Sequence, residues 1–460
     1  MMESALDGPA RDEGAQAAGH AQPTRQLQGK EEQALASQEP AAKPSLEIIF
    51  LTITFDPEPG AQHGLPLAKE MIRRGHKVKV LTTFPQYPLG RIYDGYKQSL
   101  WAWESIEGVP VLRVPIYPSH DMSGLRRAVT YLSFMASAAL VGVPLIGRAD
   151  VVFLYEPPPT NGIVSALLRL FRGTPIIHHI ADMWPDTVIA SGMVRGRATK
   201  WLLTKVLGAY CRLLYRVATF VTVLSPGFKT ILTRRGVPQD KVRVIYNWAD
   251  EAKFRPVEAD PALGARLGLQ GRFNVLYAGN IGPLQNLSAV VEAAALLKDC
   301  PGLQIVIVGT GPLETEVKQR ARVLRLDNVL FIPRIDYAEM PKVYSLADVL
   351  LVHLRDYDFL HATIPSKTQV SLASGKPVLI GAVGDAAALV RQSGAGVVCR
   401  PDDPAALAEG MRSLFLKPRA ELEEMGRRGR RFYLDNLSLE KSANVMEQLF
   451  VEASAPRRRK

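Results

Sequence analysis

The sequence predicts an α/β chain made of two Rossmann-like domains, each a doubly wound parallel sheet, that face each other across a cleft. Short and continuously apolar segments alternate with helical segments, which is typical of parallel strands buried on both faces. This alternation stops once and then restarts in the same form. A chain of 460 residues is long enough for two such domains, each with a full hydrophobic core.

The first domain is expected over residues 46–255. It opens with a strand at Ile48–Ile53, a helix from Gly64 to about Arg74 and a strand at Lys77–Leu81. Because crossover connections between parallel strands are right-handed, these two strands are predicted to be parallel neighbours. Four further strands are expected in this domain, at Val111–Val114, Val151–Leu154, Ile176–Ile180 and Phe220–Leu224.

The second domain is expected over residues 256–435. Pro256 and Pro261 interrupt the pattern just before it, where the hinge between the two domains should lie. Its first strand is predicted at Phe273–Tyr277, where the alternation restarts. Five further strands are expected, at Gln304–Val308, Val329–Ile332, Val349–Val352, Pro377–Ile380 and Gly396–Val398.

Both ends of the chain differ in composition from the two domains. Residues 1–45 are rich in Ala, Gln, Glu, Gly and Pro and poor in large apolar groups, which predicts a disordered tail without the features of a secretory signal peptide. Within the last segment, 436–460, a helix at about Ser438–Ala453 is expected to return to the first domain. The basic run Arg457–Lys460 that follows is either a solvated tail or a segment attracted to anionic lipid.

Cysteine usage and charge narrow the possible classes of protein. Cys211, Cys300 and Cys399 lie far apart, which argues against a disulfide framework or a zinc site and predicts a cytoplasmic setting. The formal net charge of +11 favours anionic partners. No zinc-finger spacing, RNA-recognition signature or basic-region heptad is present, so nucleic acid is not expected as a partner.

Glycine-rich turns follow the first two strands of the second domain. In open parallel sheets ligands bind outside the carboxyl ends of the strands, and such turns suit a diphosphate approached by backbone N–H groups. The spacing is not that of a Walker loop, so ATP hydrolysis is not expected. The nucleotide-binding candidates after these strands and the next one are Gly279, Asn280, Gly282, Gly309, Gly311 and Arg334.

A predicted helix begins at Pro365-Ser366-Lys367. The helix dipole, the hydroxyl group and the ammonium group together make an anion-binding place, and Lys367 is the residue expected to bind the diphosphate. The alternative is a solvated lysine at a helix start. A basic residue in the first turn opposes the helix dipole and so favours a bound anion.

Two loops of the first domain also carry candidate residues. Gly60 and Gly64 lie in the loop after the first strand, where they serve either close backbone approach to a ligand or a tight turn. Asp182 follows the strand at Ile176–Ile180 and is a candidate to orient or deprotonate an acceptor hydroxyl, unless it caps the next segment. His178 and His179 should face opposite sides of that strand, so metal binding by the pair is not expected, and His179 is kept as a catalytic candidate.

Taken in order, the motifs resemble the retaining glycosyltransferases of family 4, which have the GT-B fold. They are most similar to the bacterial branch that builds O-antigen, capsule and exopolysaccharide. The resemblance covers about residues 47–450. The motifs that carry it are the opening glycine loop, Arg74-Gly75-His76, Phe84-Pro85-Gln86-Tyr87-Pro88, Asp182-Met183-Trp184-Pro185, Tyr277-Ala278-Gly279-Asn280-Ile281-Gly282, Gly309-Thr310-Gly311-Pro312, Pro365-Ser366-Lys367 and Ala373-Ser374-Gly375-Lys376-Pro377.

This resemblance implies a nucleotide sugar, usually UDP-linked, on the second domain, an acceptor on the first, and neither an obligatory metal nor another cofactor. The expected transfer is of a hexosyl or N-acetylhexosaminyl unit. Many members place a Glu where this chain has Val370, and basic residues where it has Asn280 and about Gln285. Ribose and phosphate contacts are therefore expected to shift to Gln369 and Lys367, or else the chain has lost activity.

Two stretches of the first domain bear on the acceptor. The apolar stretch Ala128–Ile146 is expected to do one of three things: pack in the core, dock on a membrane surface or span a membrane. The stretch Lys200–Arg216 is basic and amphipathic. Together they suggest a glycan or polyprenyl-diphosphate-linked acceptor and peripheral attachment to an anionic inner membrane face. The rival classes are an enzyme like the UDP-N-acetylglucosamine 2-epimerases and a non-catalytic subunit that binds sugar nucleotides.

Overall fold

The computed structural model describes residues 44–59, 63–119, 123–190 and 196–455. The chain divides into two units, Met1–Pro44 and Ser45–Lys460. The predicted disordered tail, apart from its last residues, and the basic run Arg457–Lys460 lie outside the described residues, as does Gly60.

The first sheet has eight strands in the order β3-β4-β2-β1-β5-β6-β7-β8. Only β3 pairs antiparallel with its neighbour. The strands are β1 (Glu47–Leu51), β2 (Lys77–Thr83), β3 (Ala102–Ile106), β4 (Val109–Val114), β5 (Val151–Glu156), β6 (Ile176–Ile180), β7 (Phe220–Val223) and β8 (Val242–Val244). The helices are α2 (Leu65–Arg73), α3 (Gly124–Ser137), the π-helix η1 (Ala138–Gly142), α4 (Val143–Leu145), α5 (Asn161–Arg172), α6 (Asp186–Ala190), α7 (Arg197–Val217) and α8 (Pro226–Arg234).

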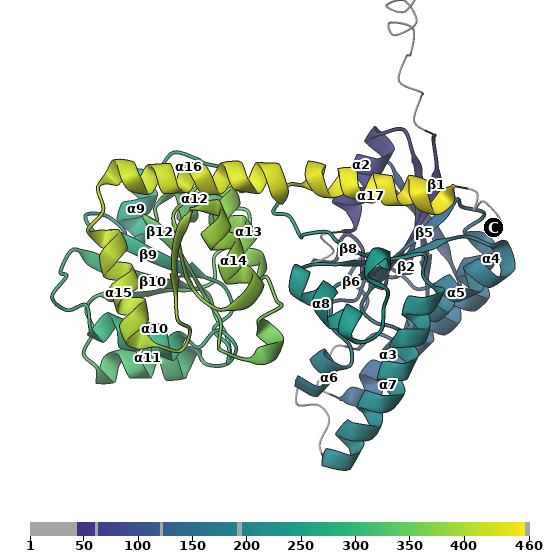
Figure 1. Cartoon of the computed structure of the whole chain (residues 1–460), viewed down its shortest axis with the longest axis horizontal. Coiled ribbons are helices and arrows are strands. Elements are labelled where there is room, and N and C mark those ends of the chain that lie inside the picture. The colour runs from purple at the N-terminus through teal and green to yellow at the C-terminus, as the bar shows by residue number, and fades with distance from the viewer. Residues whose placement is uncertain (1–43, 60–62, 120–122, 191–195, 456–460) are drawn as a thin grey trace, which may run out of the picture. The chain divides into compact units, whose positions relative to one another are not determined.

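The second sheet has six strands, all parallel, in the order β11-β10-β9-β12-β13-β14. These strands are β9 (Phe273–Ala278), β10 (Leu303–Val308), β11 (Val329–Ile332), β12 (Val349–His353), β13 (Val378–Gly381) and β14 (Gly396–Cys399). The helices around it (Figure 1) are α9 (Pro261–Leu267), α10 (Leu287–Ala295), α11 (Glu314–Val323), α12 (Met340–Ser345), α13 (Ser366–Ala373), α14 (Gly384–Ser393), α15 (Pro404–Phe415) and α16 (Arg419–Asn436).

Two parallel sheets with interleaved helices confirm the predicted fold class. The first two predicted strands are parallel neighbours, with Ile48 opposite Val78. The sequence prediction missed β3 and β8. Both are edge strands: β3 alternates between partly buried and exposed residues, and β8 is only three residues long. Neither has the long apolar run that marks a strand buried on both faces.

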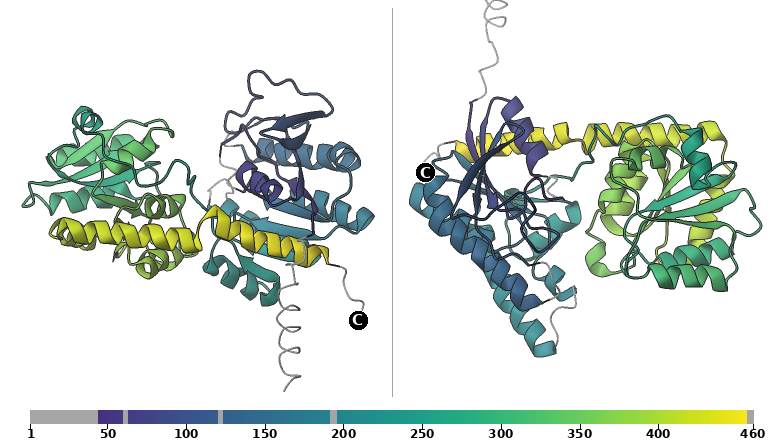
Figure 2. Two further views of the ribbon diagram at one scale, coloured as in Figure 1. Left: turned by 90° about the horizontal axis from the view of Figure 1, so that it is seen from above. Right: turned by 180° about the vertical axis from the view of Figure 1, so that it is seen from behind.

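The last helix, α17 (Leu439–Ser454), lies against α2, β5 and β6 of the first sheet (Figures 1 and 2). Its buried Phe450 meets Phe153 edge-on, with ring centroids 6.0 Å apart, and lies 6.5 Å from Phe50. An apolar face of α17 thereby closes the core on this side of the sheet. Burying such side chains contributes about 1.5–3 kcal/mol each.

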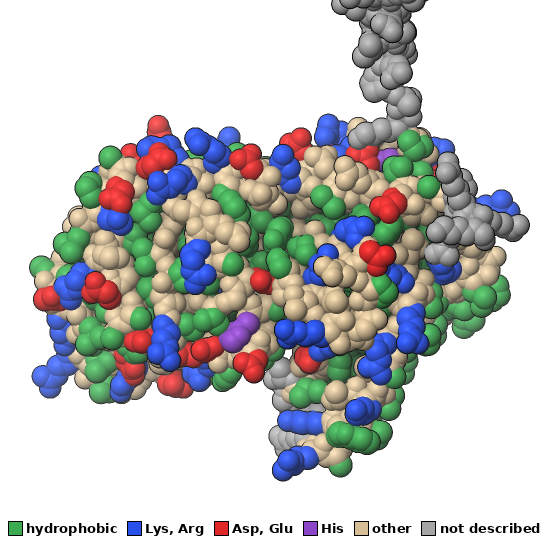
Figure 3. Space-filling view, viewed as in Figure 1, with side chains coloured by type: hydrophobic (Ala, Val, Ile, Leu, Met, Phe, Trp, Pro, Cys, Tyr) green, Lys and Arg blue, Asp and Glu red, His purple; other side chains and the backbone are tan. Residues whose placement is uncertain are grey.

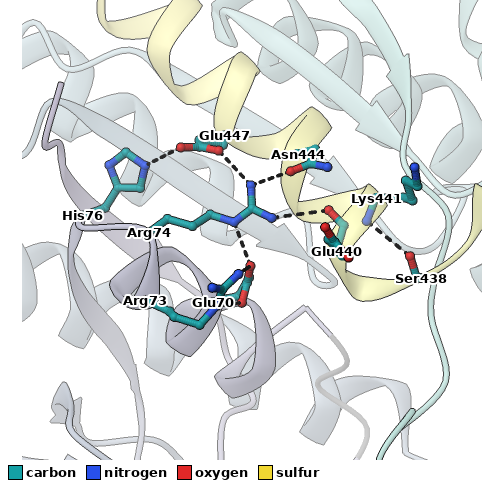
Figure 4. A network of polar contacts seen from close by, with 9 residues as sticks. All are labelled: Glu70, Arg73, Arg74, His76, Ser438, Glu440, Lys441, Asn444 and Glu447. Atoms are coloured by element: carbon teal, nitrogen blue, oxygen red, sulfur yellow. Dashed lines mark hydrogen bonds and ion pairs between the residues drawn. The ribbon is translucent and has the colours of Figure 1, made fainter. Parts of the chain in front are cut away.

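A polar network fastens α17 to the end of α2 (Figure 4). Arg74 donates to Glu447 at 2.7 Å, to Asn444 at 2.6 Å and to Glu70 at 2.7 Å, and His76 lies 3.4 Å from the other oxygen of Glu447. The side chains of Arg74 and Glu447 are almost fully buried, so each charge depends on its partners. The motif Arg74-Gly75-His76 therefore has a structural role, because it holds the returning helix.

Candidate functional site

The glycine turns of the second domain continue the sheet beyond the ends of its strands. The N–H of Gly279, after β9, donates to Val308 O at 2.9 Å, and the N–H of Gly309, after β10, donates to Ile332 O at 3.0 Å. Ile281 N donates to Thr310 O at 3.0 Å. These N–H groups are hydrogen-bonded within the protein. They are therefore not available to bind a diphosphate, which is the role that the sequence predicted for these turns.

The same turns pack so closely that only glycine fits. A side chain at Gly309 would collide with the carbonyl oxygen of Gly279, and one at Gly311 would lie 2.7 Å from Asn280 Oδ1. Gly279 and Gly309 have φ angles of +144° and +135°, which L side chains rarely adopt. Among the described residues, the N–H groups of Asn280 and Gly282 find no acceptor, and these two remain for a ligand.

Replacing Gly309 with alanine is expected to lower the free energy of unfolding by about 2–4 kcal/mol, through overpacking and the unfavourable φ. Chemical denaturation measures the loss. Gly271→Ala is the matched control: it has a positive φ of +72° but no atom within 4 Å of the added methyl group, so about 1 kcal/mol is expected. Equal losses in the two variants would show that the contact between the turns does not matter.

Lys367 reaches back over the first of these turns. Helix α13 starts at Ser366 after Pro365, and the Lys367 ammonium lies 2.6 Å from the position that a Cβ atom at Gly279 would occupy. It also lies 5.1 Å from the centre of the Tyr277 ring. No carboxylate among the described residues pairs with it, and burial lowers its pKa. An unpaired and desolvated ammonium at a strand end is a strong place for an anion.

The other candidate nucleotide-binding residues of the second domain differ in their burial and in their hydrogen-bond partners. Gln369 is almost fully buried, and its Oε1 has no partner among the described residues. Ser366 is exposed at the start of α13. Asn280 Nδ2 lies 3.5 Å from Gln285 Oε1. Arg334 is exposed after the outermost strand β11, and no hydrogen bond or ion pair joins it to these residues.

In the first domain, His179 lies inside a stack of aromatic rings. Its ring is 4.1 Å from that of His63 and 5.4 Å from that of Tyr155, and His63 in turn meets Trp248 at 4.3 Å. Its Nδ1 is hydrogen-bonded to Thr222 at 2.8 Å. Burial lowers the pKa of His63 to about 3 and that of His179 well below its usual value, so both rings are neutral.

This burial changes the expected role of His179. The side chain is fully buried, with its Nδ1 bonded to Thr222, and its neutral ring packs against those of Tyr155 and His63. His178 points to the opposite side of β6, as predicted. There its Nε2 contacts Glu156 Oε2, and its ring meets Tyr215 edge-on at 5.5 Å.

Asp182 lies at the carboxyl end of β6 and is partly buried. Its carboxylate accepts no hydrogen bond from the described residues, which argues against the alternative role as a cap. Burial, and then the negative charge of Glu156, raise its pKa. Burial raises the pKa of Tyr155 and of Tyr131 in α3, and the negative charge of Asp182 raises both pKa values further. The group is therefore a carboxyl with open hydrogen-bonding capacity in an aromatic setting, as an acceptor hydroxyl would require.

The opening loop is organised by a residue that the sequence analysis did not select. Glu58 is buried and accepts hydrogen bonds from the backbone N–H groups of Phe55, Gln86 and Tyr87, at 3.1, 2.7 and 2.6 Å. It thereby joins the loop after β1 to the motif Phe84–Pro88. Gly64 precedes α2 as its N-cap residue, without a side-chain cap.

The structure adds three further residues to the site that were not candidates from the sequence, namely His63, Glu156 and Tyr131. His63 stands within the loop that was singled out, but only its contact with His179 distinguishes it. Among the described residues, no group of three or more His, Cys, Asp or Glu side chains could hold a metal ion.

Two protein families match successive parts of the chain. The family described as glycosyl transferase 4-like domain matches residues 61–248, and the family described as glycosyl transferases group 1 matches residues 265–432. The matches correspond to the halves that carry the first and the second sheet.

Individual proteins agree with these matches. The chain is 28% identical to glycosyl transferase WcaI of Escherichia coli K12, named for colanic acid biosynthesis, over 81% of this chain and 93% of WcaI. It is 25% identical to the glycosyltransferase WbjE of Pseudomonas aeruginosa, over 70% of this chain and 81% of WbjE.

Solved structures share the fold. HepE of Anabaena, in complex with UDP and glucose, superimposes with a TM-score of 0.63 at 18% identity, covering 88% of this chain and 99% of HepE. WaaG, a glycosyltransferase involved in lipopolysaccharide biosynthesis, has a TM-score of 0.58 at 17% identity, with the same coverage.

Proposed function

The chain belongs to the glycosyltransferases that join a glycosyl transferase 4-like domain to a glycosyl transferases group 1 domain in the GT-B fold, and we propose that it transfers a sugar from a UDP-sugar in surface polysaccharide biosynthesis. The transfer proceeds with retention of anomeric configuration and without a metal ion. The transferred unit is a hexosyl or N-acetylhexosaminyl group.

The single observation that supports this proposal best is the unpaired Lys367 ammonium over the Gly279 turn. Departure of a nucleoside diphosphate places negative charge on its oxygen atoms. A preorganised ammonium and free N–H groups stabilise that charge most in a setting with little water. Lys367, with the N–H groups of Asn280 and Gly282, therefore takes the part that a metal ion plays in other transferases.

The nucleotide and its ribose occupy the same edge of the second sheet. We assign the ribose to Gln369, whose buried carbonyl oxygen is unpaired among the described residues and can accept from a ribose hydroxyl. The bound UDP of HepE supports a uridine nucleotide as the donor. The two named relatives favour a product that enters a surface polysaccharide.

The acceptor belongs to the first domain, where Asp182 orients and deprotonates its hydroxyl. Its open carboxylate and the aromatic rings of Tyr131 and Tyr155 suit a sugar hydroxyl and a sugar ring face. We assign the acceptor to a glycan or a polyprenyl-diphosphate-linked glycan. The protein would act in the cytoplasm, at the inner face of the cell membrane.

A thermal-shift panel of nucleotide sugars tests the donor. A UDP-sugar at 100 times its dissociation constant should stabilise the protein by about 2.7 kcal/mol, whereas the matching ADP- and GDP-sugars at the same concentration should shift it less. The panel needs no acceptor and so separates donor binding from transfer. If no nucleotide sugar raises the melting temperature, the assignment of the second domain as a donor site is wrong.

A further inference from the structure

The helical segment Gly124–Leu145 is unusual for a globular domain. Over 22 residues it has a mean hydropathy of 1.7 in its most apolar window, and only 28% of that window is buried. A core helix with this composition would be mostly buried. Leu125 and Leu140 are each 77% exposed, and Val129 and Leu132 also reach the surface. Their spacing places all four on one face of the helix.

The packing of its second half argues against a membrane-spanning helix. Ala138, Gly142 and Val143 are buried in the core of the first domain, and a Cβ atom at Gly142 would lie 2.7 Å from Leu81 of β2. The segment is thus seated on the sheet along part of its length. To span a bilayer it would have to leave this core, so only its outer face is open to a partner.

Helix α5 packs against both α3 and α7, and α7 has the same character as α3 (Figure 1). Trp201, Leu202, Val206 and Leu213 are all more than half exposed, with Trp201 at 63%. Figure 3 shows basic side chains over the part of the molecule where α7 lies. We call the exposed residues Leu125, Val129, Leu132, Leu140, Trp201, Leu202, Val206 and Leu213 the helical docking face.

The charged residues of the two segments that carry the helical docking face have one sign. Neither Gly124–Leu145 nor α7 contains an Asp or a Glu. The two segments carry seven basic residues: Arg126, Arg127, Arg197, Lys200, Lys205, Arg212 and Arg216. A second copy of this chain would bring like charges together if it docked through the same face. An apolar surface with only basic residues is complementary to anionic lipid.

We propose that the helical docking face binds an anionic lipid bilayer as a peripheral surface, with its leucines, Val206 and Trp201 entering the headgroup region. Each Lys or Arg near such a surface contributes about 1 kcal/mol at physiological ionic strength. Trp201 at the edge of the apolar residues matches the preference of tryptophan for a membrane interface.

Docking through this face also explains how an acceptor reaches the site. The inner side of α3 carries Tyr131, whose ring lies 6.4 Å from that of Trp184, next to Asp182. One helix thus faces lipid on one side and the candidate acceptor site on the other. This step rests on the proposed function: it identifies the acceptor as a glycan anchored in the bilayer by its lipid.

Sedimentation with vesicles tests the docking. The full chain should sediment with vesicles of phosphatidylglycerol and phosphatidylcholine at low salt, and less with phosphatidylcholine alone or at high salt, where the Debye length falls to about 3 Å. The double variant Leu132→Glu, Val206→Glu should bind anionic vesicles at least about tenfold more weakly, since it loses apolar contact and adds two negative charges. The matched control Leu296→Glu, Val323→Glu changes exposed apolar residues of the second domain and should bind like the unchanged protein.

Two further measurements keep the outcomes distinct. Trp201 fluorescence should shift to the blue on anionic vesicles, and Trp201→Phe should lose that shift. Equal melting temperatures of the double variant and its control show that both are folded. The proposal fails if the unchanged protein does not sediment with anionic vesicles, if the double variant sediments equally well, or if that variant instead abolishes a dimer in solution. Vesicle binding without stabilisation by any nucleotide sugar would overturn the proposed function but leave the docking intact.

Discussion

Replacing Lys367 with methionine should lower kcat by about 10²–10³-fold, the loss typical of removing one group that stabilises developing negative charge. The ammonium lies over Gly279 and has no carboxylate partner among the described residues. Methionine keeps the length and apolar stem of the side chain but removes the charge. Initial rates with saturating donor and acceptor, together with donor affinity from thermal shifts, measure the effect.

The same variant should be at least as stable as the unchanged protein at neutral pH. Burial lowers the pKa of Lys367, so the folded state disfavours the charged form relative to the unfolded state. This destabilisation is present at neutral pH, begins to decrease as the pH rises through the lowered pKa, and is gone above the ordinary pKa of lysine. Methionine removes it at every pH. A loss of activity without a loss of stability would separate a functional lysine from a structural one.

Lys342→Met is the control for this variant. Lys342 forms an exposed ion pair with Glu339 in the same domain, so its loss should change both activity and stability little. If Lys367→Met keeps full activity, or if it unfolds the second domain, the ammonium does not stabilise a departing diphosphate.

Replacing Asp182 with asparagine should lower kcat by about 10²–10⁴-fold, the usual contribution of a general base, and leave donor binding unchanged. The carboxylate has no hydrogen bond to a described residue, so the substitution breaks no structural contact. Donor affinity is unaffected because the donor site belongs to the other domain. A thermal-shift titration with the UDP-sugar and a transfer assay separate the two effects.

The pH dependence gives an independent check on Asp182. Burial and Glu156 raise its pKa, so the unchanged protein should lose activity as the pH falls through a value above the ordinary range of aspartate. This acid limb should vanish in Asp182→Asn. Since the folded state disfavours the ionised carboxyl, the variant should also be as stable as the unchanged protein, or more stable, at neutral pH. An acid limb that persists would assign the titration to another group.

Much of the fold was predictable from the sequence because its strands are buried on both faces. Strand β6 begins and ends at the predicted residues and is buried along its whole length. Strand β11 lies at an edge, but it also has the predicted bounds because Val329–Ile332 is a short apolar run between Asn328 and Pro333. The edge strand β3 was missed because one face of it meets solvent, so its sequence lacks that run. The position of Lys367 near the Gly279 turn also followed from pattern, because the carboxyl ends of parallel strands share one edge of a sheet.

The roles of several motif residues did not follow from pattern. Gly279 and Gly309 were expected to bring N–H groups to a ligand, but those N–H groups are bonded within the protein. His179 was expected at a substrate, but it is buried against the rings of His63 and Tyr155, which lie far apart in the sequence. Arg74 binds Glu447 near the other end of the chain.

By itself, the sequence determined the order of strands and helices, the location of the polar loops and the positive charge of α7, because these depend on neighbouring residues and their periodicity. Only the tertiary structure decided which polar groups already have partners and which apolar residues stay exposed. Burial and hydrogen bonding depend on what the rest of the chain brings to each group. Only the folded structure therefore shows that Lys367 and Asp182 have no partner among the described residues, and that α3 is largely exposed.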